Sequence, residues 1–81
     1  MDKRIAVVGI ILDDNNRAEE VNNVLHQYGE IIVGRMGLPY KERGCSVISV
    51  IVDADTDKIS ALTGRLGKIS GISVKAAISK G

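Results

Sequence analysis

The sequence lacks the residues on which several classes of protein depend. It has no Trp and no Phe, and its tyrosines are Tyr28 and Tyr40, so a base-stacking platform for nucleic acid lacks its usual rings. The single cysteine, Cys45, excludes an internal disulfide and every multi-cysteine metal or iron–sulfur site within one chain. Eleven Lys and Arg residues against ten Asp and Glu leave a net charge of +1, too little to hold nucleic acid by neutralising phosphates. We expect no cofactor, no metal and no direct nucleic-acid partner.

Long apolar runs are also missing. The longest covers residues 5–12, whereas a membrane-spanning helix needs about 20 residues. No small-residue cleavage site of a signal peptide follows this run. We therefore expect a cytoplasmic protein with no membrane contact, folded as a single domain over residues 1–81.

The residues that are abundant are small and aliphatic. Hydrophobic residues make up 44% of the chain, but without large aromatic side chains each buried residue removes less area from water. The core of a domain this small contributes about 3–5 kcal/mol at most. We expect contacts between identical subunits, in a dimer or a tetramer, to supply part of the stability.

Hydrophobic periodicity divides the chain into six elements. Strands are predicted at residues 4–12, 30–36, 45–54 and 72–79, and helices at 17–28 and after a cap at Asp55 or Thr56. Asn16 and Glu19 have the spacing of a capping box at the start of the first helix, after a turn that contains Asp13 and Asp14. Residues 37–44 are predicted to be a loop. The order β-α-β-β-α-β predicts an α+β, ferredoxin-like fold, a four-stranded antiparallel sheet with two helices on one face.

Such a fold leaves one face of its sheet without a cover. The strand at 4–12 is nevertheless apolar on both of its faces, and Val47 and Ile51 extend the second apolar surface onto the strand at 45–54. Scattered exposed aliphatic residues are ordinary on protein surfaces, but a continuous patch indicates a partner. We expect this open side of the sheet to contact another copy of the chain.

Seven residues are candidates for a ligand site or an interface. Gly64 lies inside a predicted helix, where glycine costs about 1 kcal/mol relative to alanine, so either the helix frays or another backbone or ligand comes close. Arg65 and Lys68 flank it and either bind an anion or are solvated charges. The segment 34–44 is longer than a tight hairpin needs and is either a functional loop or a plain hairpin extension. Its candidate residues are Arg35, Gly37, Pro39 and Tyr40.

No arrangement of residues suggests catalysis or a metal site. His26 falls off the apolar stripe of its helix and is expected to face solvent, and Cys45 is expected to be a half-buried or buried thiol. The acidic residues Asp53, Asp55 and Asp57 imitate the opening of a calcium loop, but the glycine and glutamate that such a loop requires are absent. We therefore assign no catalytic residue.

Two segments resemble a known family. Residues 35–39 (RMGLP) and 59–75 (ISALTGRLGKISGISVK) are similar to those of small stand-alone proteins named as regulators of the iron-only hydrogenase system. The resemblance covers about residues 5–75. It implies a fold similar to ACT domains and to the metal-binding domain of nickel-responsive repressors, relatives that sense a small ligand and oligomerise.

Two hypotheses for the function follow. The first is a non-enzymatic, homo-oligomeric regulatory module that senses a small effector or binds a partner protein. The alternative is a small-molecule-binding or acyl-phosphate-type enzyme on the same fold. In that second class an anion binds at the first strand–helix turn, where Asp13 and Asp14 would repel it.

Overall fold

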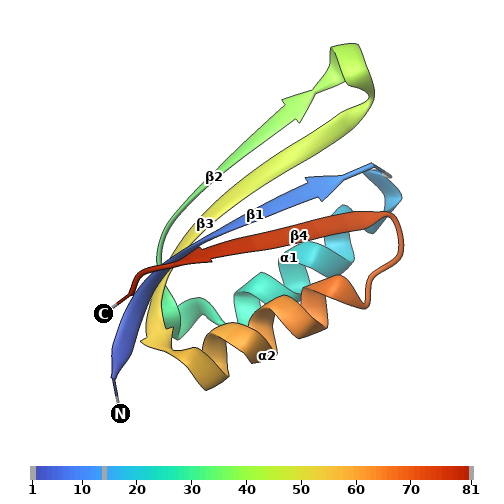
Figure 1. Cartoon of the computed structure of the whole chain (residues 1–81). Coiled ribbons are helices and arrows are strands. Elements are labelled where there is room, and N and C mark those ends of the chain that lie inside the picture. The colour runs from blue at the N-terminus through green and yellow to red at the C-terminus, as the bar shows by residue number, and fades with distance from the viewer. Residues whose placement is uncertain (1, 14, 81) are drawn as a thin grey trace.

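The computed structural model describes residues 2–13 and 15–80. Its elements are β1 (Lys3–Leu12), α1 (Ala18–Gln27), β2 (Ile32–Tyr40), β3 (Cys45–Asp55), α2 (Thr56–Gly67) and β4 (Ile72–Ile78). The strands form one sheet in the order β2-β3-β1-β4, and every neighbouring pair is antiparallel. Both helices lie on the same side of this sheet (Figure 1). The predicted ferredoxin-like fold is confirmed.

The core lies between the helices and one face of the sheet. Along β1, Ala6, Val8, Ile10 and Leu12 are buried and alternate with exposed neighbours, as the two-residue period of a strand requires. The other buried residues come from both helices, from β3 and from the turn after α2: Val21, Val24, Leu25, Ile48, Val50, Val52, Ala54, Ile59, Leu62, Leu66 and Ile69. These side chains are aliphatic, so helix and sheet meet through small, interlocking surfaces.

The two helices begin in different ways. The N-cap of α2 is Asp55, as predicted, and its Oδ1 accepts a hydrogen bond of 2.9 Å from the backbone N–H of Lys58. The capping box predicted at Asn16 and Glu19 is wrong: a 3-10 turn at Asn15–Arg17 leads into α1, whose N-cap is Arg17. The lead-in turn satisfies early backbone groups in place of a capping side chain.

The turn before α1 is tied to the far end of the chain. Asp13 donates its backbone N–H to the carbonyl of Gly71 at 2.9 Å, which joins the end of β1 to the connection between α2 and β4. The second acidic residue predicted in this turn, Asp14, lies outside the described residues.

The loop predicted at residues 37–44 is wrong for residues 37–40, which belong to β2, and right for residues 41–44, which form a turn. The first residues of the predicted second strand form a 3-10 turn (Gly29–Ile31), and β2 instead continues to Tyr40, pairing Pro39 with Ser46. Because β2 is an edge strand, a proline without an N–H is tolerated there. A short 3-10 turn at Lys41–Arg43 and Gly44, whose φ of 65° suits glycine, close the hairpin.

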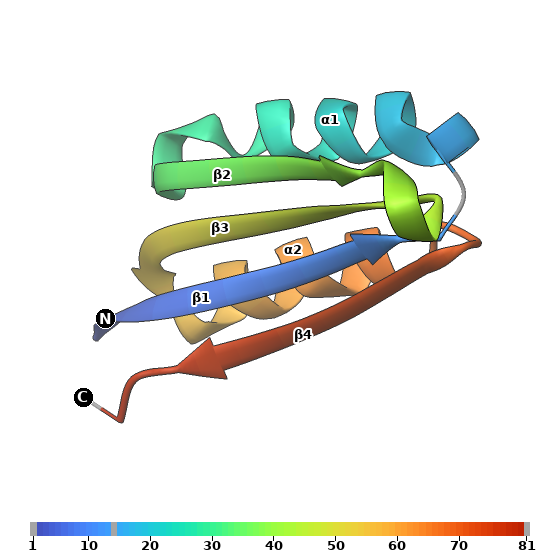
Figure 2. The ribbon, with the colours of Figure 1, turned by 90° about the horizontal axis from the view of Figure 1, so that it is seen from above.

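The end of this hairpin, residues 37–46, is called the arm below. It rises away from the helices (Figure 1), and Figure 2 shows its turn at one end of the sheet. The molecule measures 41 × 19 × 17 Å and exposes 5371 Å², whereas a compact monomer of this mass exposes about 4,700 Å². The excess surface belongs to an elongated shape that favours contact with another molecule.

Candidate interface and effector site

The face of the sheet opposite the helices carries a continuous apolar surface, here called the open face. Its large apolar side chains are between 36% and 70% exposed: Ile5, Val7, Ile11, Met36, Leu38, Tyr40, Val47 and Ile51. The register places Val7 opposite Ile51 and Ile11 opposite Val47, so the exposed side chains of β1 and β3 are direct neighbours. A patch of this kind on a small domain marks an interaction site.

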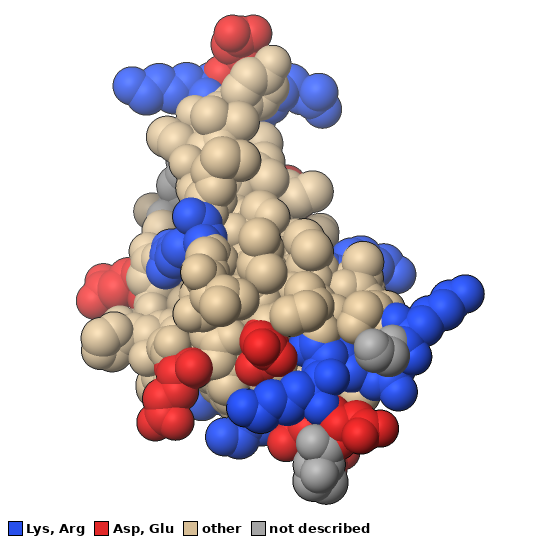
Figure 3. Space-filling view, turned by 90° about the vertical axis from the view of Figure 1, so that its left-hand side faces the viewer, with Lys and Arg blue, Asp and Glu red and all other residues tan. Residues whose placement is uncertain are grey.

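The charges of the molecule leave this apolar surface largely free. Figure 3 shows most charged side chains gathered at the base of the molecule and at the tip of the arm, with a broad, mostly uncharged expanse between them that a blue patch interrupts at one side. The tip carries Lys41, Glu42 and Arg43 in its turn. Desolvating the expanse therefore buries few charges, which lowers the cost of covering it.

Gly9 interrupts the open face in the middle of β1. A glycine there weakens a strand unless another backbone or a ligand comes close. Nothing within residues 2–13 and 15–80 requires a glycine here, because a Cβ at Gly9 would meet only the carbonyl oxygen of Lys75, at 3.8 Å. The missing side chain leaves an apolar hollow of about 220 Å³ that Ile11 and Val47 also line. The sequence reasoning missed this residue, although a glycine inside the central apolar run was visible.

Three of the seven candidate residues meet in a notch between the arm and α1. Arg35, Gly37 and Pro39 lie on the helix-facing side of β2 and line a concavity of about 280 Å³. The Nη2 atom of Arg35 donates to Oδ1 of Asn22 on α1 at 2.8 Å, so the guanidinium is held at the wall of the notch. The remaining walls are mostly apolar, from Leu12, Ala18, Leu38, Val47 and Ile48, with Ser46 beside them.

The other four candidates lie elsewhere. Tyr40 is on the open face, opposite Cys45. The guanidinium of Arg65 lies over the ring of Tyr28, 5.6 Å from its centroid, a cation–π contact that joins α2 to the end of α1. Lys68 is exposed at the C-cap of α2. The structure therefore does not unite the seven residues in one site.

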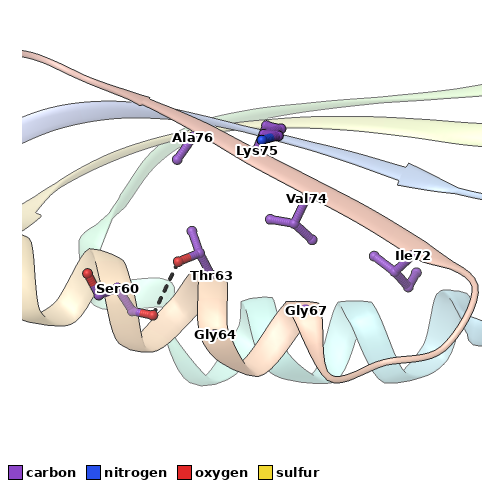
Figure 4. Close-up of a pocket in the computed structure, with 8 residues that line it drawn as sticks. All are labelled: Ser60, Thr63, Gly64, Gly67, Ile72, Val74, Lys75 and Ala76. Atoms are coloured by element: carbon purple, nitrogen blue, oxygen red, sulfur yellow. Dashed lines mark hydrogen bonds between the residues drawn. The ribbon is translucent and has the colours of Figure 1, made fainter.

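Gly64 lines a separate groove between α2 and the edge strand β4. Figure 4 shows Thr63 on the helix reaching toward the strand, opposite Val74. The groove has a volume of about 490 Å³ and is lined by Ser60, Thr63, Gly64, Gly67, Ile72, Val74, Lys75 and Ala76. The helix continues through Gly64 to Gly67, so fraying does not explain this glycine.

A Gly64→Ala substitution is expected to stabilise the isolated protein. A Cβ at this position meets no atom within 4 Å, and alanine gains about 1 kcal/mol over glycine inside a helix. For a domain of this size that gain raises the melting temperature by about 4–8 °C, measurable by thermal unfolding followed by circular dichroism. A lower melting temperature would show that something beyond the described chain already packs against this side of α2.

The lone histidine lies on α1 and the lone cysteine lies on β3. Cys45 is half-buried and His26 is exposed, as predicted. Within residues 2–13 and 15–80, no group of three or more His, Cys, Asp or Glu residues is placed to hold a metal ion. The same part of the chain contains no helix that is long and apolar enough to cross a membrane.

Comparisons with known proteins agree with this geometry. The solved structure of uncharacterized protein TM1266 from Thermotoga maritima is 36% identical, superimposes with a TM-score of 0.92, and the match covers 98% of this chain and 100% of that one. The ACT domain from GTP pyrophosphokinase of Chlorobium tepidum is 19% identical over 100% of this chain and 91% of its own, with a TM-score of 0.73. It shares the fold.

A curated relative is named "Putative nickel-responsive regulator", from Saccharolobus islandicus. It is 27% identical over 66 residues, which are 82% of this chain and 49% of the relative. The chain thus spans about half the length of this relative, whose name describes regulation.

The family match covers nearly all of the described fold. Residues 4–76, from the start of β1 into β4, match the family described as "TM1266-like: Iron-only hydrogenase system regulator, putative". This confirms the resemblance seen in residues 35–39 and 59–75 and supports a regulatory role. The chain therefore belongs to the TM1266-like family of iron-only hydrogenase system regulators.

Proposed function

We propose that the protein is a homo-oligomeric regulatory module without catalytic activity of its own. It senses a small effector or binds a partner protein, in the cytoplasm. The observation that carries this proposal is the open face, whose apolar side chains are exposed on the side of the sheet that the helices leave bare. The simplest cover for such a face is the same face of another copy.

The free energy gained by covering the open face is comparable to the free-energy cost of association. Ile5, Val7, Ile11, Val47 and Ile51 are each roughly half-buried within one copy, and burying a whole aliphatic side chain contributes about 1.5–3 kcal/mol. Covering these residues on two copies therefore yields on the order of 10 kcal/mol. Association costs about 4–15 kcal/mol, so the apolar gain matches the cost, and further contacts decide the affinity.

The notch between the arm and α1 is the proposed effector site. Arg35 offers a guanidinium that is fixed by Asn22, and Leu12, Ala18 and Ile48 offer an apolar wall. A small molecule with one anionic group and an apolar part matches this combination. Because Leu38 and Val47 also lie on the open face, pairing and ligand binding would share these two side chains.

Control of transcription, if the protein exercises it, is proposed to run through another protein. The net charge of +1 and the absence of Trp and Phe do not favour direct binding to DNA. The acyl-phosphate enzyme remains the weaker hypothesis: Asp13 in the turn after β1 carries a negative charge, and its backbone N–H already donates to the carbonyl of Gly71, so this turn does not favour an anion.

Native mass spectrometry of the full chain, purified from its own cells, tests the proposal. We expect a dimer or a tetramer, and a retained small molecule released on denaturation. Sedimentation equilibrium at micromolar concentration supplies an independent measure of the mass. A pure monomer would contradict the homo-oligomeric module, and turnover of an acyl phosphate would favour the enzyme instead.

A further inference from the structure

Two opposite charges lie on the open face beyond its apolar centre. Lys75 is on β4, level with Gly9, and Asp53 is on β3, level with Ile5. Among residues 2–13 and 15–80, neither side chain forms an ion pair within the chain. At the end of the sheet Lys3 and Asp55 are opposite each other in the register of β1 and β3, and the carboxylate of Asp55 caps α2.

The placement of the two charges is self-complementary about Val7. β1 lies between β3 and β4, and Val7 lies midway between Ile5 and Gly9. With strands about 4.8 Å apart and a rise of about 3.4 Å per residue, Lys75 and Asp53 are about 17 Å apart with Val7 at their midpoint. A two-fold axis over Val7, perpendicular to the line between them, exchanges the two positions.

This axis also gives a reasonable packing of the sheets. It crosses the strands of the two copies at about 70°, near the orthogonal class of sheet-on-sheet packing. Ile51 of each copy then lies over the region of the other sheet beside Gly9, where the missing side chain leaves the hollow that Ile11 and Val47 line. A protruding side chain thus meets a depression, which accounts for a glycine that the fold of one copy does not require.

We propose that two copies of this chain pack open face to open face, with a two-fold axis over Val7 and each Lys75 in an ion pair with the partner subunit's Asp53. The inference rests on the proposed homo-oligomer. It specifies the symmetry of the pair and the ion pairs that favour one arrangement of the two faces over others. The ion pairs select this arrangement from the many ways in which two apolar faces can meet, since charge complementarity determines register and suppresses wrong pairings.

A charge swap tests the ion pairs. Sedimentation equilibrium would compare the natural chain with Lys75→Glu, Asp53→Lys and the double variant. Each single reversal places like charges together at two symmetric positions, and we expect it to raise the dissociation constant of the pair at least tenfold. The double variant restores the pairs with exchanged signs and is expected to return within about threefold of the natural value.

A matched control makes the same charge change away from the open face. Lys68→Glu reverses an exposed lysine at the C-cap of α2, at the opposite end of the helix from Asp53, and is expected to leave the dissociation constant unchanged. Circular dichroism of every variant confirms that it is folded. A double variant as weak as the single reversals would overturn the proposed ion pairs.

A crosslinking experiment tests the position of the axis without relying on charge. The Cys45→Ser substitution first removes the one natural thiol. In this background, Val7→Cys places a cysteine on the two-fold axis, next to the equivalent cysteine of the other subunit. Ile11→Cys places the cysteine about 14 Å farther along the strand, so that the two equivalent cysteines of the pair are far apart. We expect a short bismaleimide to link Val7→Cys into dimers at least tenfold more than Ile11→Cys.

The outcomes separate this inference from the proposed function. The natural chain could dimerise while the charge swap fails to restore binding and Val7→Cys fails to crosslink. That result would support the homo-oligomer and refute the proposed two-fold geometry. A natural chain that is monomeric throughout refutes both.

Discussion

A Val7→Glu variant is expected to be monomeric at concentrations where the natural chain is paired. Val7 is 44% exposed at the centre of the open face and lies between Ile51 and Ala77. A glutamate there is solvated in the single copy but would be buried without a partner in the pair, at a cost of several kcal/mol. The dissociation constant should rise at least a hundredfold, since each 1.4 kcal/mol is a factor of ten.

The control is the same residue placed on the helical side of the molecule. Ala61→Glu lies at an exposed position of α2, so sedimentation equilibrium is expected to give an unchanged mass. Equal weakening by both variants would mean that acidity, rather than the open face, disrupts the pair. Pairing that survives Val7→Glu would show that another surface holds the copies together.

A Leu62→Ala variant is expected to be largely unfolded in dilute solution. Leu62 is fully buried beneath the sheet, and truncation of a buried leucine costs about 2–5 kcal/mol. The core of a domain this small contributes about 3–5 kcal/mol, so one cavity removes most of the margin. Urea unfolding followed by circular dichroism should show little or no folded baseline.

Two controls check the Leu62→Ala prediction, one through the volume of the side chain and one through the protein concentration. Leu62→Met keeps the volume and is expected to cost less than about 1.5 kcal/mol, leaving a clear transition. If pairing stabilises the fold, the folded fraction of Leu62→Ala should increase with protein concentration, because association favours the folded state. A Leu62→Ala midpoint equal to that of the natural chain would contradict the small-core estimate.

Local sequence patterns were sufficient to predict the order of the strands and helices and the strand at residues 4–12 that is apolar on both faces. The alternation in residues 4–12 and the cap at Asp55 depend on a residue and its near neighbours, so they could be read directly. The end of β2 could not be read in this way. Gly37 and Pro39 indicate a loop locally, but β3 supplies a partner strand, and an edge position tolerates the proline.

Strand pairing, which is also nonlocal, separates the candidate residues of the predicted site onto different faces of the sheet. Arg35 and Tyr40 belong to the segment 34–44, which was predicted to be either a functional loop or a plain hairpin extension, but a strand sends alternate side chains to opposite faces. Because a bulge lies between Ile32 and Gly34, Arg35 faces α1 while Tyr40 faces the open side. Arg65, predicted as a solvated or anion-binding charge, is exposed, and its guanidinium lies over the ring of Tyr28.

The amino-acid sequence by itself determined that this chain forms a β-α-β-β-α-β sheet with one bare apolar side, because hydrophobic period and turn residues act over a few positions. The sequence also indicated that Val47 and Ile51 lie on that side, but only the tertiary structure decided which of its residues lie opposite one another. Strands distant in the chain are aligned by their pairing register, and the alignment places Lys75 and Asp53 on either side of Val7. No pattern along the chain contains that register, since it results from packing the sheet against both helices.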